Sequence, residues 1–204
     1  MNLLPTQEEV ISVLEKTGSL RRGHYKYRNG MYANQYLQIA HAMRYFQHMK
    51  TMSVALSRKL RANTELRAMI PQLSVVSPAT GGLAVAYGIV EALRANMVYW
   101  AEEVIEGQPQ RFRQYIEPQK GEKILLVDDI LRSGRNLTNL KRIVEERGAE
   151  VVGVAVMVYQ PMPVTADFGD IPLYYLARID AEYYAEAEAQ AMMAKGIVFE
   201  EVWV

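Results

Sequence analysis

The chain has 204 residues, half of them hydrophobic, and its 23 basic residues balance 23 acidic residues. This length suits one α/β domain with a full hydrophobic core, which we take as residues 1–204. The balanced charge argues against a nucleic-acid-binding protein, which normally carries a basic surplus. The lack of cysteine excludes disulfides, thiol nucleophiles and cysteine-based metal sites. With neither a charged leader before an apolar core nor a membrane-length apolar run, we expect a soluble, cytoplasmic protein.

The N-terminal part of the chain predicts a helix followed by a hairpin. A helix is expected over residues 6–17, because Thr6 and Glu9 form a capping box before an apolar face. Residues 20–39 alternate aromatic with basic or polar side chains, which predicts a β-hairpin that turns at residues 28–30. A solvated ribbon is the alternative interpretation of this segment.

A glycine-rich turn follows the first buried strand. A helix is expected from residue 40 to about residue 61, and the apolar run at residues 73–77 then predicts a buried strand. The chain continues into Thr80, Gly81 and Gly82 and an apolar helix. Glycines at the start of a helix let backbone amides approach a phosphate closely. The same residues are also typical of an ordinary tight turn between a strand and a helix.

The most informative stretch is the strand at residues 123–127 and the loop after it. It ends in Asp128 and Asp129, and a carboxylate at the edge of a core costs several kcal/mol in order of magnitude unless something binds it. A polar loop follows, and Asn136 is the expected N-cap of a helix that stops at Gly148. Acids beside an anion cradle suit a ligand with vicinal hydroxyls and a phosphate. The alternative is an ordinary strand–turn–helix with a solvated acidic corner.

Residues 123–137 resemble the phosphoribosyl-pyrophosphate (PRPP) signature of type I phosphoribosyltransferases. The resemblance implies that Asp128 and Asp129 hold the ribose 2′ and 3′ hydroxyls. It also implies a phosphate loop in contact with the substrate, made of Arg132, Ser133, Gly134, Arg135 and Asn136. Mg²⁺ is the implied cofactor, held near the two acids through PRPP and water rather than by direct side-chain ligation.

Two further segments resemble the orotate phosphoribosyltransferase branch of this family. Residues 23–30 and 36–38 are similar to its N-terminal hood, with Arg28 where the family has a substrate-binding lysine. Residues 78–83 are similar to its pyrophosphate loop. This resemblance implies that Thr80, Gly81 and Gly82 lie near the pyrophosphate.

The chain also departs from the orotate enzymes at two places. In their mobile catalytic loop the family has cations, whereas residues 102–113 carry three glutamates. Arg111 and Arg113 could replace those cations, or they could equally be surface residues. After the strand expected at residues 151–158 the family arginine that grips orotate is missing, so the base would meet Tyr159 and Gln160, or the hood.

These elements predict a doubly wound, mainly parallel sheet with helices on both faces and a small N-terminal hood. Strands are also expected at residues 97–101 and 171–176, and a helix at residues 180–195. Residues 1–40 would form the first helix and the hood, and residues 41–204 the core and the C-terminal helix.

The resemblance implies an enzyme that transfers the 5-phosphoribosyl group from PRPP to an orotate-like pyrimidine, releasing pyrophosphate in nucleotide biosynthesis or salvage. Asp128, Asp129, Arg111 and Arg113 are the expected catalytic residues. PRPP and a nucleobase or nucleoside monophosphate are the expected ligands, in a homodimer that shares the catalytic loop across its two-fold axis. The alternative is a non-catalytic regulatory protein that binds PRPP or a nucleotide, which the acidic loop and the missing arginine favour.

Overall fold

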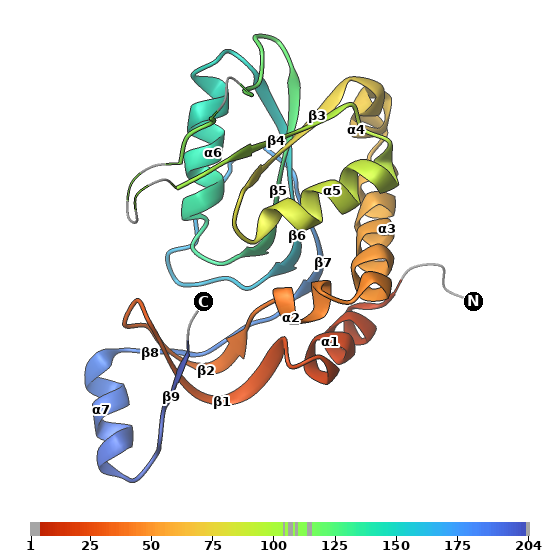
Figure 1. Ribbon diagram of the computed structural model, residues 1–204. Coiled ribbons are helices and arrows are strands. Elements are labelled where there is room, and N and C mark those ends of the chain that lie inside the picture. The colour runs from red at the N-terminus through yellow and green to blue at the C-terminus, as the bar shows by residue number, and fades with distance from the viewer. Residues whose placement is uncertain (1–4, 104, 106–107, 109, 114–115, 203–204) are drawn as a thin grey trace.

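The fold is described from a computed structural model, which covers residues 5–103, 105, 108, 110–113 and 116–202. Its core is a sheet of five strands that all run parallel (Figure 1). In their order across the sheet the strands are β4 (Met97–Ala101), β3 (Leu73–Pro78), β5 (Lys123–Leu131), β6 (Glu150–Tyr159) and β7 (Leu173–Arg178). The order reverses between β3 and β5, and in such sheets the ligand crevice opens at the carboxyl ends of the two strands that flank the reversal.

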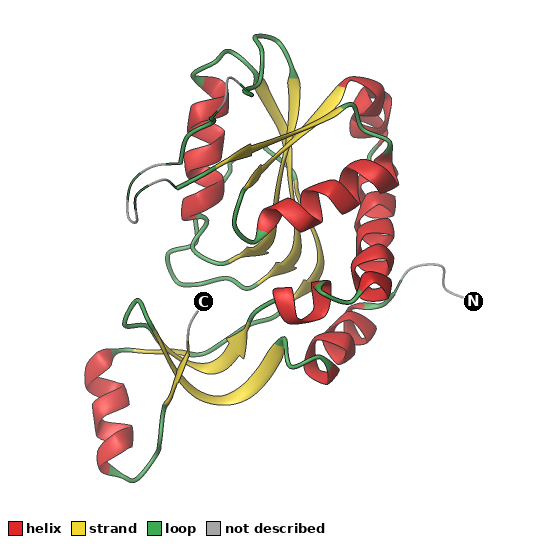
Figure 2. Cartoon of the chain, in the orientation of Figure 1, coloured by secondary structure: helices red, strands yellow, loops and turns green. Residues whose placement is uncertain are grey.

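Helices cover both faces of this sheet, as the sequence predicts (Figure 2). The helices are α1 (Gln7–Lys16), α2 (Ala40–Met43), α3 (Phe46–Ala62), α4 (Thr64–Met69), the 3₁₀ helix η1 (Ile70–Gln72), α5 (Gly82–Leu93), α6 (Arg135–Glu145) and α7 (Glu186–Ala194). One apolar cluster joins α1, α3 and α5 to the sheet, and a second joins α6 to the opposite face. Within the described part of the chain, no helix is long and apolar enough to cross a membrane.

The hood is a second sheet of four strands, built from both ends of the chain. Its order is β8 (Tyr183–Tyr184), β2 (Tyr32–Leu37), β1 (Leu20–Tyr27) and β9 (Glu200–Val202). The hairpin of β1 and β2 is the predicted one, but β8 and β9 add the C-terminal part of the chain, which the sequence did not indicate. Figure 1 shows the hood at the end of the core sheet toward which β5 and β6 run.

Two predicted helices need correction. The helix expected over residues 40–61 is interrupted at Tyr45, whose backbone is extended (φ −89°, ψ 115°), so that α2 and α3 are separate. The helix expected over residues 180–195 begins only at Glu186, because Tyr183 and Tyr184 pair with β2. In both cases an extended backbone segment interrupts a stretch whose composition favours a helix.

The loop after β5 also begins later than predicted. β5 continues to Leu131, so Asp128 and Asp129 belong to the strand and do not follow it. The N-cap of α6 is Gly134, in a left-handed conformation (φ 80°), and not Asn136. Two further strand residues, Ile130 and Leu131, therefore separate the acids from the loop.

Candidate active site

The two acids, Asp128 and Asp129, lie near the carboxyl end of the buried strand β5. The Asp129 amide donates to Asp128 Oδ1 at 2.9 Å, and the Ile130 amide donates to Asp129 Oδ1 at 2.7 Å. Burial raises the pKa of the Asp128 carboxyl well above its usual value, and the neighbouring Asp129 carboxylate raises it further. Burial also raises the pKa of Asp129. Negative charge is therefore costly here, and hydroxyl donors or a cation from a ligand would relieve it.

The glycine loop after β3 lies directly against these acids. A Cβ atom on Gly81 would lie 3.1 Å from Asp129 Oδ1, and one on Gly82 would lie 3.1 Å from Asp128 Oδ1. Gly81 also has a φ of 84°, a conformation that side chains rarely adopt. The structure thus brings together the Gly81–Gly82 turn and the acid pair, at the reversal point between β3 and β5.

The loop before α6 is supported from behind by a segment that the sequence did not single out. The Ala166 amide donates to the Ser133 carbonyl oxygen at 2.8 Å, and a Cβ atom on Gly134 would lie 2.7 Å from Ala166 Cβ. The Arg135 amide opens α6 and donates to Ser133 Oγ at 3.4 Å. Since the first amides of a helix have no partner within the helix, this loop and helix end can hold an anion.

Arg132, expected among the substrate contacts, extends from this loop to the hood. Its Nε donates to Gln160 Oε1 at 2.8 Å, and its Nη2 donates to the carbonyl oxygen of Leu37. The guanidinium carbon also lies 5.2 Å from the ring centre of Tyr27. The side chain therefore connects the loop after β5 to β1 and β2 of the hood.

Glutamates of the loop after β4 pair with the arginines that were expected to bind substrate. Glu102 and Arg111 form a short antiparallel bridge with two backbone hydrogen bonds of 3.0 Å. Arg113 Nη1 lies 2.9 Å from Glu102 Oε2, and Arg135 Nη2 lies 3.7 Å from Glu103 Oε1. The third glutamate, Glu106, lies outside the described residues.

The remaining predicted residues lie in the hairpin turn of the hood, in the first turn of α6 and at the end of β6. Arg28 is exposed in the hairpin turn of the hood, and Asn136 is exposed in the first turn of α6. The Tyr159 ring packs 5.5 Å from the Tyr175 ring, centre to centre, with the Arg178 guanidinium over it. Gln160, the residue after β6, is instead buried beside Arg132.

Residues 35–167 match the family model described as "Phosphoribosyl transferase domain". The chain is 31% identical to the orotate phosphoribosyltransferase of Erythrobacter litoralis over 191 residues, 93% of this chain and 94% of the relative. It is also 31% identical to that of Carboxydothermus hydrogenoformans over 171 residues, 84% of each chain. The chain belongs to the phosphoribosyltransferase family.

Solved structures agree with this assignment at the level of the fold. The orotate phosphoribosyltransferase of Aeropyrum pernix superposes with a TM-score of 0.64 at 16% identity, covering 91% of this chain and 98% of that one. The enzyme of Mycobacterium tuberculosis, crystallised with inorganic phosphate, gives 0.56 at 18% identity, covering 97% and 94%. Because the two relatives at 31% identity are both orotate phosphoribosyltransferases, this phosphoribosyltransferase is of the orotate-phosphoribosyltransferase-like type.

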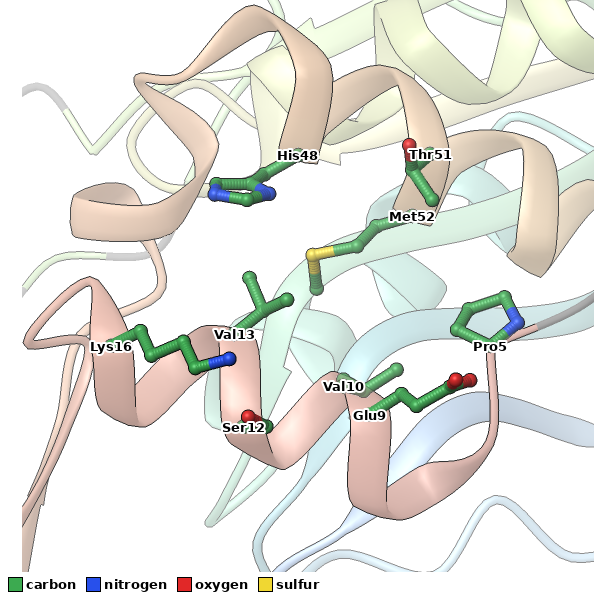
Figure 3. Close-up of a pocket in the computed structure, with 9 residues that line it drawn as sticks. All are labelled: Pro5, Glu9, Val10, Ser12, Val13, Lys16, His48, Thr51 and Met52. Carbon is green, nitrogen blue, oxygen red and sulfur yellow. The ribbon is translucent and has the colours of Figure 1, made fainter.

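One described hollow of this phosphoribosyltransferase is not lined by the acid pair. It is a cavity of about 470 Å³ between α1 and α3, where Val10 and Val13 face His48 and Met52 (Figure 3). No residue of the two predicted phosphate loops lines it. Across the described residues, no group of three or more His, Cys, Asp and Glu side chains could hold a metal ion.

Proposed function

We propose that this phosphoribosyltransferase transfers the 5-phosphoribosyl group from PRPP to a nitrogen of an orotate-like pyrimidine and releases pyrophosphate. The observation that carries the proposal is the contact between the Gly81–Gly82 turn and the carboxylates of Asp128 and Asp129. PRPP carries a phosphate at one end of its ribose and a pyrophosphate at the other. Its site therefore needs acceptors for the ribose hydroxyls, placed between two loops that present backbone amides. Those loops follow β3 and β5, on the two sides of the reversal in the sheet.

In this proposal each group has one task. Asp128 and Asp129 accept hydrogen bonds from the two ribose hydroxyls, which relieves the cost of their burial. The amides of residues 133–136 bind the 5′-phosphate at the start of α6, and those of residues 80–82 lie near the pyrophosphate. The site then acts by orienting the reactants and by stabilising charge on the leaving group.

The reaction needs no nucleophile from the protein. The lone pair of a base nitrogen forms the new bond to C1 of the ribose, while the bond from C1 to the pyrophosphate oxygen breaks and its electrons leave with pyrophosphate. The proton that the nitrogen loses passes to the released pyrophosphate or to water. Arg111 and Arg113 are the proposed contacts of the leaving group, and Arg113 would first have to leave Glu102.

Mg²⁺ fits the residues at this site. The ion is usually held by one or two carboxylates together with substrate phosphates and water, and the acid pair is a donor set of that kind. Asp128 and Asp129 would hold it through PRPP and water. When bound, it supplies positive charge that offsets the charge of the pyrophosphate.

A homodimer is the second part of the proposal, with Arg111 and Arg113 acting in the site of the neighbouring subunit. The loop that carries them is anchored in its own subunit by the bridge between Glu102 and Arg111 and by Phe112, which is buried in the second apolar cluster.

A regulatory protein that binds PRPP or a nucleotide without turnover is the competing function. One observation favours it: the Glu102 and Glu103 carboxylates already neutralise Arg113 and Arg135. Both ion pairs are largely exposed, and such pairs contribute only about 0–1 kcal/mol. A pyrophosphate with Mg²⁺ could therefore displace them.

The test is pyrophosphate release from PRPP and Mg²⁺ with each nucleobase in turn, combined with calorimetry of PRPP binding. We expect release with orotate, and a loss of at least about a hundredfold in the Asp128→Asn/Asp129→Asn variant. The control is Glu145→Gln/Glu146→Gln, which neutralises two adjacent acids on the exposed side of α6. Binding of PRPP or a nucleoside monophosphate without turnover on any base would favour the regulator. A protein that binds neither PRPP nor a nucleoside monophosphate would contradict both functions.

A further inference from the structure

Arg132 lies where the core and the hood meet, and it touches both. We propose that Arg132 is a positioning residue that couples binding at the phosphate loop to closure of the hood over the base. This inference rests on the proposed function, because it takes the loop at residues 133–136 as the phosphate site. It adds a role that neither the acid pair nor the glycine turn has.

On the core side, the backbone of Arg132 is fixed by the segment after β6. Thr165 Oγ1 donates to the Arg132 carbonyl oxygen at 2.7 Å, and the Gln160 amide donates to the Leu131 carbonyl oxygen at 2.9 Å. The next residue, Ser133, begins the phosphate site. An anion that orders Ser133 and Gly134 therefore orders the base of the Arg132 side chain as well.

On the hood side, the guanidinium meets the ends of two strands. Leu37, whose carbonyl oxygen accepts from Nη2, is the last residue of β2, and Tyr27, whose ring lies under the guanidinium, is the last residue of β1. Besides the backbone pairing of β1 with β2, the Tyr27 hydroxyl donates to the Gln35 carbonyl oxygen of β2 at 2.8 Å. The positive charge also reaches Tyr183 of β8, where it opposes the rise in the pKa of that hydroxyl caused by burial.

On Gln160 and on the hood strands β2 and β8, three buried polar atoms have no hydrogen-bond partner among the described residues. They are Gln160 Nε2, Gln35 Oε1 and the Tyr183 hydroxyl. The orientation of both amides is set by their other atom, since Gln160 Oε1 accepts from Arg132 and Gln35 Nε2 donates to the Asp180 carbonyl oxygen at 2.7 Å. Buried atoms of this kind oppose closure. The polar part of the contact between hood and core is therefore incompletely satisfied, and a ligand that orders Arg132 can shift it.

The test measures hydrogen–deuterium exchange of residues 20–37 with and without saturating ribose 5-phosphate, a ligand that cannot react. In the wild-type protein we expect the ligand to slow exchange in this segment by about fivefold or more. In Arg132→Ala we expect ribose 5-phosphate to bind with similar affinity and to leave the exchange of this segment unchanged. Arg178→Ala is the matched control, because Arg178 also lies over a tyrosine ring, that of Tyr159, and it should behave as the wild type.

Several results would overturn the inference. Hood protection in Arg132→Ala equal to that of the wild type would remove the coupling role. Loss of ribose 5-phosphate binding in that variant would make Arg132 a direct ligand. If the wild-type protein binds the ligand but its hood is not protected, the inference alone fails. If the wild-type protein does not bind it, the proposed function fails too.

A second variant covers the case in which Arg132→Ala does not fold. Arg132→Met/Gln160→Leu replaces both hydrogen-bonding partners by apolar side chains of similar size and removes the unpartnered Gln160 Nε2. We expect this protein to melt close to the wild-type temperature and to bind ribose 5-phosphate without protecting residues 20–37. Protection of the hood in this folded variant would equally contradict the inference.

Discussion

At the scale of single residues, the acid pair combines a function with a cost in stability. The pKa of Asp128 is raised in the folded protein, chiefly by burial. Below the ordinary aspartate pKa of about 4, both folded and unfolded chains are protonated and burial carries no charge penalty. Between that value and the higher pKa of the folded protein, the unfolded chain has lost a proton that the folded chain retains, so the free energy of unfolding falls as the pH rises through this range. Above the folded pKa both states are ionised, and the loss of stability is complete.

Replacing this carboxyl by an amide should separate stability from binding. We expect Asp128→Asn to melt above the wild type at pH 8, by about 2–4 °C for each kcal/mol of relieved charge burial. The difference should vanish near pH 3, while ribose 5-phosphate binding is lost at pH 8. Thermal unfolding at both pH values and calorimetry check this. Glu145→Gln, on an exposed helix face, is the control, and a lower melting temperature for Asp128→Asn at pH 8 would contradict the argument.

Gly134 allows a comparison of backbone strain with steric fit. Gly134 and Gly121 have nearly the same φ, 80° and 83°, but only at Gly134 would a Cβ atom meet a neighbour among the described residues, Ala166 at 2.7 Å. We expect Gly121→Ala to cost about 1 kcal/mol in unfolding free energy from strain alone. Gly134→Ala should cost about 1–3 kcal/mol more and weaken phosphate binding. Urea unfolding of both variants measures the difference, and equal losses would show that Ala166 yields at no cost.

At the scale of secondary-structure elements, the hood depends on strands from both ends of the chain. β9 pairs with β1 through Tyr25 and Glu200, and Phe199 packs at 5.3 Å from the rings of Tyr32 and His24. The core sheet has its own five strands and shares no strand with the hood. Removal of β9 should therefore increase local opening of the hood and leave the core sheet as stable as before.

A truncation tests this independence. Deleting residues 197–204 should speed amide exchange in residues 20–37 and leave exchange in β5 at its wild-type rate. The control is deletion of residues 203 and 204 only, which removes none of the described β9 contacts. Exchange that quickens equally in hood and core would mean that the two sheets unfold together.

At the scale of the whole molecule, the proposed dimer makes a quantitative prediction. Asp128→Asn/Asp129→Asn and Arg111→Ala/Arg113→Ala should each be inactive alone. If the arginines act across the interface, each mixed dimer has one complete site, and equal mixing should restore up to about a quarter of wild-type activity. Sedimentation confirms that dimers form, and a pyrophosphate assay measures recovery. Mixed dimers without recovered activity would place the arginines in their own subunit or outside catalysis.

The local structure of the chain could be predicted from its sequence. The capping box of α1, the hairpin of β1 and β2, the five core strands and the helices on both faces were all predicted, because each depends on neighbours within a few residues. The Gly81–Gly82 turn and the acid pair, which lie against each other, were recognised for the same reason. Family membership followed from their motifs and is confirmed by the family match over residues 35–167.

Contacts between distant segments were decided only by the tertiary structure. The sequence could not show that Arg132 reaches Leu37, 95 residues earlier, or that Ala166 supports Gly134. Nor could it show that Tyr183–Tyr184 and Glu200–Val202 complete the hood, since strands of two or three residues have no periodicity to read. Local patterns determine where a strand or turn forms, whereas the direction of a long side chain and the partner of a short strand depend on what the folded chain brings beside them.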